Sequence, residues 1–254
     1  MFVDLFFDIF LGLLNNLLSF FLLTFYAFIS SVAMVPPILI VGAGGHGRSA
    51  LTLLRRHGGF NPIGFIDSIN AVGASLYGLD ILGRESDIES VCKRYSVSHI
   101  FLAIGNNFHR EAIALRLRRQ LPSAIFPPIV DPSAVVSPDI KLNSGVIIFP
   151  MAHVGSGCTL KQGSFINTKS SLDHDCSLGS YASLAPGAIT GGNVIIGSRS
   201  FIGLGAHVIQ NVRIGHDTVV GAGSLVLQDQ PDGIVAYGSP AQFVRTHLPH
   251  DPYF

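Results

Sequence analysis

One histidine with an aspartate on each side stands in the stretch INTKSSLDHDCSLG, residues 166–179: His174 lies between Asp173 and Asp175. A histidine accepts and releases protons near neutral pH, so it suits general base catalysis. A neighbouring carboxylate can orient the ring and stabilise the imidazolium ion that forms. We interpret His174 and Asp175 as the candidate acid–base pair of the chain, and Asp173 as a surface residue. Three other histidines are interpreted as solvated surface: His153, His207 and His216.

A glycine-rich turn suggests a second kind of site. Residues 38–47, ILIVGAGGHG, join an apolar run to a turn of the form G-x-G-x-x-G, and the amphipathic segment that follows reads as a helix ended by Gly58. Such a strand–turn–helix unit brings backbone N–H groups and a helix N-terminus to phosphates. Asp67 ends a second expected strand, and Gly105 follows a third. Three strand–helix units meeting at one crevice predict a nucleotide site.

The elements that position His174 follow from a repeat of six residues. Stepping by six from Val136 to Val226 meets an aliphatic side chain at fifteen of sixteen positions, with Thr190 the exception. From Val146 to Ser224, the residue four places beyond each aliphatic is Val, Ala, Cys, Ser or Thr. This hexapeptide repeat predicts a parallel β-helix, in which three repeats make one triangular coil of eighteen residues.

The repeat fixes which side chains point inward. Leu172 occupies an inward position and Cys176 a small-residue corner, so His174 between them is expected on the outer surface. Cys158 and Cys176 are eighteen residues apart and are expected to stack in the core of successive coils, as fillers and not as nucleophiles or a disulfide. β-Helical prisms of this kind commonly associate in threes, so a homotrimer is expected.

Composition excludes some classes of protein and leaves the start of the chain open. Sixteen acidic residues balance sixteen basic ones, so there is no electrostatic case for nucleic-acid binding. Three cysteines without even spacing fit a reducing cytosol, and a cytoplasmic location is expected. Residues 5–33 are apolar and long enough to span a bilayer. The alternative is a dispensable extension, residues 1–34, with the natural start at Met34.

The whole order of elements resembles the NeuD/PglD-type sugar acetyltransferases over residues 37–246. The matching stretches are VGAGGHGR, GFIDS, AIGNN with Arg110, INTKSSLDHD, APGAITGGNVIIG and GSPA. The resemblance implies a Rossmann-like βαβ domain followed by a left-handed parallel β-helix. It also implies an acetyl-CoA-dependent enzyme without a metal, which acts on sialic acids or UDP-linked amino sugars. We expect a nucleotide-sugar domain at 35–130, an acetyl-CoA-binding β-helix at 131–229 and a C-terminal tail at 230–254.

The resemblance also assigns roles to particular residues, with His174 as the general base. Family members often carry histidine where Ser183 stands and glutamate where Asp175 stands. Backbone N–H groups around Gly191 and Gly192 are expected to stabilise the oxyanion of the thioester. The residues implied to bind the nucleotide sugar are Gly44, Gly45, His46, Asp67, Ser68 and Gly105, and those implied to bind coenzyme A are Ser183, Gly192, Leu204 and Ala222.

These features predict an acetyltransferase that acts on an amino group of a UDP-4-amino sugar. An O-acetyltransferase acting on sialic acid or another surface-glycan sugar is the first alternative, because base catalysis serves amines and hydroxyls alike. A non-catalytic nucleotide-sugar sensor is another alternative. An NAD-dependent oxidoreductase is disfavoured, because no catalytic Tyr/Lys or Cys/His set accompanies the glycine-rich turn. The sequence does not name the sugar.

Overall fold

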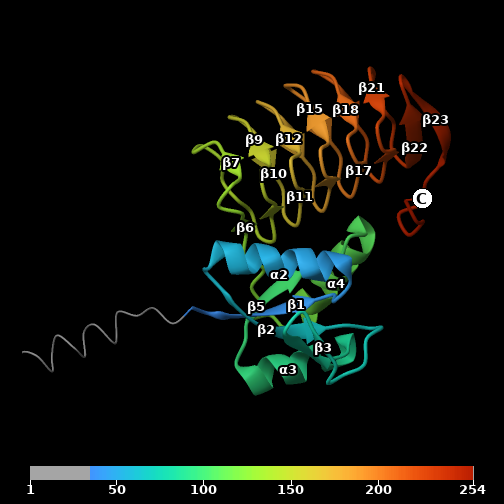
Figure 1. The fold of residues 1–254 in the computed structure, drawn as a ribbon. Helices are drawn as coiled ribbons and strands as arrows, with labels where there is room; N and C mark the ends of the chain where they lie inside the picture. Colours follow the sequence, from blue (N-terminus) through green and yellow to red (C-terminus); the bar gives the residue numbers. More distant parts are fainter. Residues whose placement is uncertain (1–34, 254) are drawn as a thin grey trace, which may run out of the picture. The chain divides into compact units, whose positions relative to one another are not determined.

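The computed structural model describes residues 35–253, and the ribbon in Figure 1 shows their course. The apolar stretch at residues 5–33, and with it the choice between a membrane helix and a dispensable extension, lies outside the described residues. Within residues 35–253, every helix is too short or too polar to cross a membrane.

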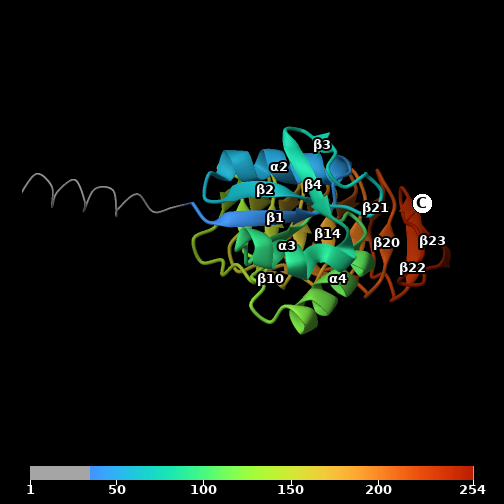
Figure 2. The ribbon, with the colours of Figure 1, turned by 90° about the horizontal axis from the view of Figure 1, so that it is seen from below.

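The first half of the described chain is a twisted α/β layer. Its five-stranded sheet has the order β3-β4-β2-β1-β5, with the antiparallel strand β3 at one edge and β5 at the other. Helix α2 lies on one face, and helices α3 and α4 lie on the other, as Figure 2 shows. The elements are β1 (Pro37–Val41), α2 (Gly45–His57), β2 (Asn61–Ile66), β3 (Ser75–Leu76), β4 (Leu79–Gly83), the 3₁₀ turn η1 (Glu85–Asp87), α3 (Ile88–Tyr95), β5 (His99–Leu102) and α4 (Asn107–Gln120).

Strand β1 is apolar throughout because both faces of its sheet are covered. Ile38 and Ile40 pack toward α2, whereas Leu39 and Val41 pack toward α3 and α4. This continuous burial is typical of a strand inside a parallel sheet. The strand leads into Gly42, whose φ of +102° favours glycine, and the chain then enters α2. The predicted strand–turn–helix unit is therefore present.

The second half is a left-handed parallel β-helix with three sheets, one on each side of the coil. Strands pair with strands eighteen residues further along the chain, as Ser171 does with Ile189. The domain-facing sheet consists of β6 (Ile129–Val130), β8 (Ile147–Ile148), β11 (Phe165–Ile166), β14 (Ser183–Leu184), β17 (Phe201–Ile202), β20 (Val219–Val220), β22 (Ile234–Gly238) and β23 (Ala241–Thr246). The second sheet consists of β7 (Val135–Val136), β9 (His153–Val154), β12 (Ser171–Leu172), β15 (Ile189–Thr190), β18 (His207–Val208) and β21 (Leu225–Val226). The third sheet consists of β10 (Thr159–Leu160), β13 (Ser177–Leu178), β16 (Ile195–Ile196) and β19 (Arg213–Ile214).

The inside of the β-helix is filled by the residues that the repeat predicts. Leu160, Leu178 and Ile196 stack in successive coils of the third sheet and are almost fully buried. Cys158 and Cys176 are buried as free thiols in the same core, as predicted. The fold class expected from the sequence is confirmed.

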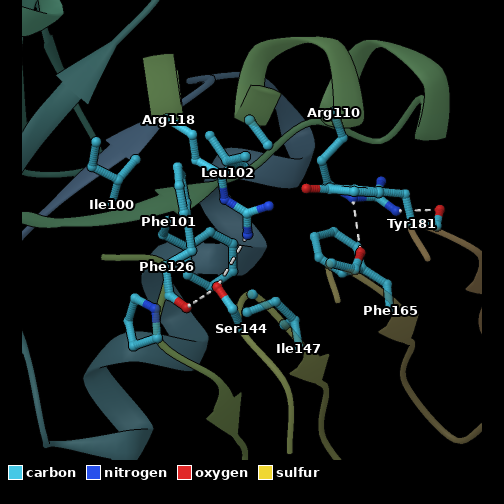
Figure 3. Close-up of a pocket in the computed structure, with 14 residues that line it drawn as sticks. Ile100, Phe101, Leu102, Arg110, Arg118, Phe126, Ser144, Ile147, Phe165 and Tyr181 are labelled. Atoms are coloured by element: carbon cyan, nitrogen blue, oxygen red, sulfur yellow. Dashed lines mark hydrogen bonds between the residues drawn. The ribbon is translucent and has the colours of Figure 1, made fainter. Parts of the chain in front are cut away.

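The α/β layer packs on the domain-facing sheet through an unusual buried cation. Arg110 of α4 is 1% exposed, and its guanidinium carbon lies 3.9 Å from the centre of the Phe165 ring. Figure 3 shows the two side chains next to each other. Its N–H groups donate to the carbonyls of Ile104, Gly163 and Tyr181. Burial lowers the pKa of Arg110 to about 10, which leaves it charged at neutral pH. Arg110 therefore joins the two halves of the molecule.

Candidate active site

The turn that joins β12 to β13 carries the predicted acid–base pair. Nδ1 of His174 lies 2.9 Å from Oδ2 of Asp175, and about half of each side chain is exposed. The hydrogen bond to Asp175, together with the charge of Asp173, outweighs partial desolvation and raises the pKa of His174 above its usual value near 6.5. The Asp173 carboxylate also accepts the backbone N–H of His174 at 2.8 Å. The histidine is thus on the outer surface, as predicted, and Asp175 fixes its ring.

Two glycines in the neighbouring coils leave room for this pair. A Cβ atom on Gly192, eighteen residues after His174, would lie 2.4 Å from Nε2 of the imidazole. A Cβ atom on Gly157, eighteen residues before Asp175, would lie 2.3 Å from its Oδ1. Both distances are far below van der Waals contact, so any larger residue would displace the His174 and Asp175 side chains. Gly157 was not predicted, although its spacing from Asp175 is the signal that could have identified it.

The hydrogen-bond ladder of the second sheet is interrupted beside His174. In the adjacent coils, the N–H of Gly155 donates to the Leu172 carbonyl and the N–H of Gly191 to the Val208 carbonyl. At the equivalent place the N–H of Asp173 donates to the hydroxyl of Thr190, at 3.2 Å, and not to its carbonyl. Thr190 is the single non-aliphatic residue in the inward series. The departure from the repeat therefore lies in the coil next to the one that carries His174.

The two buried cysteines hold the same turn from within. The thiol of Cys158 donates to the Asp173 carbonyl at 2.7 Å, and that of Cys176 donates to the Gly191 carbonyl at 3.2 Å. Their role as core fillers thus includes positioning the turn of His174 and the adjacent turn of Gly191 in the next coil.

The predicted oxyanion donors differ in availability. The N–H of Gly191 is already committed to the Val208 carbonyl at 2.8 Å, so it cannot also bind a ligand oxygen. The N–H of Gly192 makes no hydrogen bond to any residue between 35 and 253, and it lies in the turn beside the His174 ring. The expectation for Gly191 is wrong, and Gly192 remains as an available donor next to the His174 ring.

The predicted nucleotide crevice lies at the carboxyl ends of the parallel strands. No atom lies within 4 Å of a Cβ built on Gly44, Gly45 or Gly105, so the space beyond each is open to a ligand. A pocket of about 190 Å³ continues past Asp67 and Ser68.

Asp67 itself is largely used within the protein. Its carboxylate accepts the N–H groups of Ala43, Ile69 and Asn70 and the Asn70 amide, at 2.7–3.1 Å. Burial opposes ionisation, but these hydrogen bonds prevail and lower the pKa of Asp67. Asp67 therefore braces the two loops that form the crevice, and its Oδ1, with a single donor, is the oxygen left for a ligand.

Two of the residues predicted to contact a substrate, His46 and Ser183, have side chains that do not face an open surface. The His46 ring stacks on Phe165 with 5.5 Å between centroids, and its Nε2 is buried without a partner. Burial, reinforced by the Arg110 charge, lowers the pKa of His46 to about 4, so the ring is neutral. Only the backbone of His46, in the first turn of α2, is therefore available to bind a phosphate. The prediction for its side chain is not supported by this geometry.

Ser183 is enclosed in the same interface. Its hydroxyl donates to Asn107 at 2.7 Å and accepts from Arg110 at 3.1 Å, under the α/β layer. This burial argues against the predicted contact with coenzyme A. The physical reason is that an outward position on the domain-facing sheet is covered by the protein's own first half.

Leu204 and Ala222 lie on another corner of the coil from His174. Both belong to turns that join the domain-facing sheet to the second sheet, and Leu204 is 54% exposed. The N–H of Gly223 donates to the Leu204 carbonyl at 2.7 Å, which stacks the two turns directly. They form an exposed apolar edge, separated from the His174 corner by the width of the second sheet. Over residues 35–253 there is no group of three or more His, Cys, Asp or Glu side chains able to hold a metal ion.

The fold and this site define a hexapeptide-repeat acyltransferase with an N-terminal α/β domain. Comparison with known proteins agrees, because residues 37–117 match the family described as the PglD N-terminal domain. The chain is 28% identical over 160 residues to a GDP-perosamine N-acetyltransferase of Escherichia coli O157:H7, which covers 61% of this chain and 70% of that protein.

Two solved structures extend the comparison to most of the described chain. A variant of the GDP-perosamine N-acetyltransferase of Caulobacter crescentus, in complex with CoA and GDP-perosamine, is 31% identical with a TM-score of 0.78 and covers 83% of this chain and 98% of that one. The acetyltransferase domain of PglB from Neisseria gonorrhoeae FA1090, in complex with acetyl coenzyme A, is 32% identical with a TM-score of 0.76 and covers 82% and 98%. The chain belongs to the NeuD/PglD-type sugar acetyltransferases, and it is an acetyltransferase.

Proposed function

We propose that the protein transfers the acetyl group of acetyl-CoA to the amino group of a nucleotide-linked amino sugar, with His174 as the general base. The observation that carries the proposal is the exposed His174–Asp175 pair beside Gly192. The comparisons support it, because relatives at 31% and 32% identity bind CoA with GDP-perosamine or acetyl coenzyme A. An amino group is favoured over a hydroxyl, since the named activity of the Caulobacter and Escherichia relatives is N-acetylation.

His174 supplies the base through its outer nitrogen. With Nδ1 hydrogen-bonded to Asp175, the neutral ring carries its proton on Nδ1 and has a lone pair on Nε2. As the sugar nitrogen forms a bond to the thioester carbonyl carbon, Nε2 takes a proton from that nitrogen. The C–S bond then breaks, the coenzyme A sulfur takes up a proton, and the products are an amide and a free thiol.

Asp175 and Gly192 act on the charges that develop in this step. The Asp175 carboxylate stabilises the imidazolium ion. It occupies the space that the absent side chain of Gly157 leaves free, and this position keeps the carboxylate beside the imidazole ring. The free N–H of Gly192 is a donor for the carbonyl oxygen as that oxygen becomes negative. Removing one such donor in other enzymes costs roughly 10²–10³ in rate. We infer that the turn of Gly192 serves both the base and the oxyanion.

The two substrates use different parts of the molecule in this proposal. The apolar edge at Leu204 and Ala222 suits the pantetheine arm of acetyl-CoA, whereas Ser183 is too buried to contribute. The open glycines Gly44, Gly45 and Gly105 receive the diphosphate and the sugar at the crevice. A homotrimer, in which grooves between subunits hold the coenzyme, stays a prediction. The resemblance implied a uridine nucleotide, and the two GDP-perosamine relatives add a guanosine nucleotide as a candidate.

The test follows thiol release from acetyl-CoA when nucleotide-linked 4-amino sugars are added, with free sialic acid as the competing acceptor. We expect thiol release with an amino sugar and none with sialic acid. His174→Ala should lower kcat by about 10²–10⁴-fold, the usual contribution of a general base. Binding of both substrates should be unchanged, because His174 moves a proton and anchors neither of them.

The matched control is His153→Ala, which removes another exposed histidine of the second sheet, bonded to Ser171. It should leave kcat near the wild-type value. Neither variant opens an interior cavity, so melting temperatures should not move. Activity of His174→Ala within a few-fold of wild type at unchanged melting temperature would remove the base assignment, and acetylation of sialic acid alone would remove the amino-sugar proposal.

A further inference from the structure

The segment that follows β23 folds back onto the first turn of α4, and Figure 1 shows it, in red, bending toward that helix. The hydroxyl of Tyr253 in this segment accepts the backbone N–H of Asn107 at 2.6 Å. The Tyr253 ring stacks on Phe201 of β17, with 4.5 Å between the ring centres. Burial raises the pKa of Tyr253 to about 12, so the phenol is neutral at physiological pH. A neutral hydroxyl from a distant part of the chain therefore caps one of the N–H groups that the start of α4 leaves unpaired.

Asn107 is the residue at which this segment, α4 and the β-helix meet. It is fully buried. Its side-chain N–H groups donate to the carbonyls of Arg199 and Ser200, at 3.1 Å each. Its side-chain oxygen accepts from the Arg110 guanidinium at 2.8 Å and from the Ser183 hydroxyl at 2.7 Å. The whole hydrogen-bonding capacity of this side chain is used within the protein, so the position of Asn107 determines that of Arg110.

Arg110 in turn holds the loop between β5 and α4. Its Nη1 donates to the carbonyl of Ile104 at 2.9 Å, and the carbonyl of Gly105 lies 3.5 Å from the same nitrogen. In a trans peptide, the carbonyl and the N–H of the next residue point in opposite directions. The N–H groups of Gly105 and Asn106 therefore point away from Arg110, and neither makes a hydrogen bond to any residue between 35 and 253. Because the space beyond Gly105 is open, the loop presents two available donors to a ligand.

Resting on the proposed function, we infer that Tyr253 is a positioning residue for the nucleotide sugar. The Tyr253 hydroxyl fixes Asn107, Asn107 fixes the Arg110 guanidinium, and Arg110 aims the two available N–H groups at the substrate. Phosphates and sugar hydroxyls both offer oxygens that accept such donors. The affinity for the nucleotide sugar thus depends on a side chain that acts only through other residues. Coenzyme A, which the β-helix binds in the proposed function, should not depend on Tyr253.

The test compares Tyr253→Phe with the wild type in the full chain. Phenylalanine keeps the ring on Phe201 and removes only the oxygen that accepts the Asn107 N–H. Calorimetry without acetyl-CoA, so that no turnover occurs, measures the affinities for a GDP-linked 4-amino sugar, a UDP-linked one and CoA. We expect the tighter-binding nucleotide sugar to lose about three- to tenfold in affinity, the usual effect of one hydrogen bond, while CoA stays within about twofold. In steady-state kinetics, KM for that sugar should rise by the same factor while kcat is unchanged.

Tyr237→Phe is the matched control, because it removes the same atom from an exposed tyrosine of β22. It should leave all three affinities at the wild-type values. Tyr253→Ala also removes the stacked ring, and it should weaken nucleotide-sugar binding at least as much as Tyr253→Phe.

Three results would overturn the inference and leave the proposed acetyl transfer intact. The first is a nucleotide-sugar affinity in Tyr253→Phe equal to that of the wild type, and the second is an equal loss of nucleotide-sugar and CoA binding. The third is a lower kcat at unchanged KM, which would indicate a smaller folded fraction and a purely structural role. Failure of the wild type to bind either nucleotide sugar would instead remove the proposed function, and the inference with it.

Discussion

The α/β layer and the β-helix build their sites in opposite ways. In the β-helix, every turn has near-equivalents eighteen residues away, and the site consists of departures from them: a threonine at an aliphatic position, and glycines where a Cβ would meet His174 or Asp175. In the α/β layer, the crevice consists of backbone loops that the strand order brings together. The β-helix thus positions particular side chains within a regular repeat, whereas the α/β layer leaves open space for a ligand.

This difference separates the two tasks of the enzyme. A stacked, hydrogen-bonded coil holds a catalytic side chain within a narrow range of positions, which acid–base chemistry requires. Loops at the ends of strands offer free N–H groups and room for a phosphate. The buried Arg110 links the two regions, since it contacts Ile104 beside the crevice and Phe165 in the β-helix. Substitutions on the two sides should therefore change different kinetic parameters.

Among substitutions that leave His174 in place, the largest effect is expected in the crevice. Gly45→Val places a β-branched side chain in space that is open in the protein, so folding should be unaffected while close approach of the diphosphate is blocked. We expect nucleotide affinity to fall by about 30-fold, equivalent to roughly 2 kcal/mol. Calorimetry with the preferred nucleotide and with coenzyme A measures both affinities. Gly45→Ala, with a smaller side chain, should give an intermediate loss, and a parallel loss of coenzyme A binding would contradict the separation of the two sites.

The sequence predicts more of the β-helix than of its contact with the α/β layer, and the reason is physical. The six-residue period dictates the inward face of every coil, so the β-helix, the buried cysteines and the exposed position of His174 could all be predicted. What a repeat does not show is which outward face is covered, and Ser183 was misplaced because the α/β layer lies on it. The direction of the His46 ring could not be predicted either. The glycine turn predicts the position of its backbone, but the ring stacks on Phe165, which is far away in the sequence.

Thr190 tests whether departures from the repeat serve catalysis. Thr190→Val restores the aliphatic side chain with nearly the same shape, and it removes the hydroxyl that accepts the Asp173 N–H. The turn that carries His174 should then lose its present position, and kcat should fall by about tenfold because small misplacements of a catalytic group are costly. KM for both substrates should hold, and the melting temperature should stay level or rise. Steady-state kinetics and thermal unfolding measure these quantities.

Thr190→Ser is the matched control, because it keeps the hydroxyl and should keep most of kcat. If valine and serine lower kcat equally, keeping the hydroxyl does not keep the activity, and the proposed catalytic role of the ladder break is contradicted. A loss of stability in Thr190→Val would show that the hydroxyl serves the fold.

The smallest effect is expected at Asp175, where the change is one of charge. Asp175→Asn keeps the shape of the side chain above Gly157 but removes the negative partner of the imidazole. Because both groups are half exposed and screened by water, we expect only about a fivefold loss in kcat at high pH, where His174 is neutral in both proteins. Asp173→Asn is the matched control, since an asparagine oxygen can still accept the His174 N–H.

The pH dependence makes this prediction specific. A general base acts only when deprotonated, so activity falls as the pH drops through the pKa of His174. In the wild type the Asp175 hydrogen bond raises that pKa above about 6.5, and the fall should therefore begin above the value for an ordinary histidine. Without the carboxylate the pKa decreases, and the acid limb of kcat/KM should move to lower pH. The deficit of Asp175→Asn should consequently shrink as the pH is lowered, and Asp173→Asn should shift the limb less. An acid limb at the same pH in the wild type and Asp175→Asn would mean that His174 is not the group that titrates, and the regular coil would then position some other base.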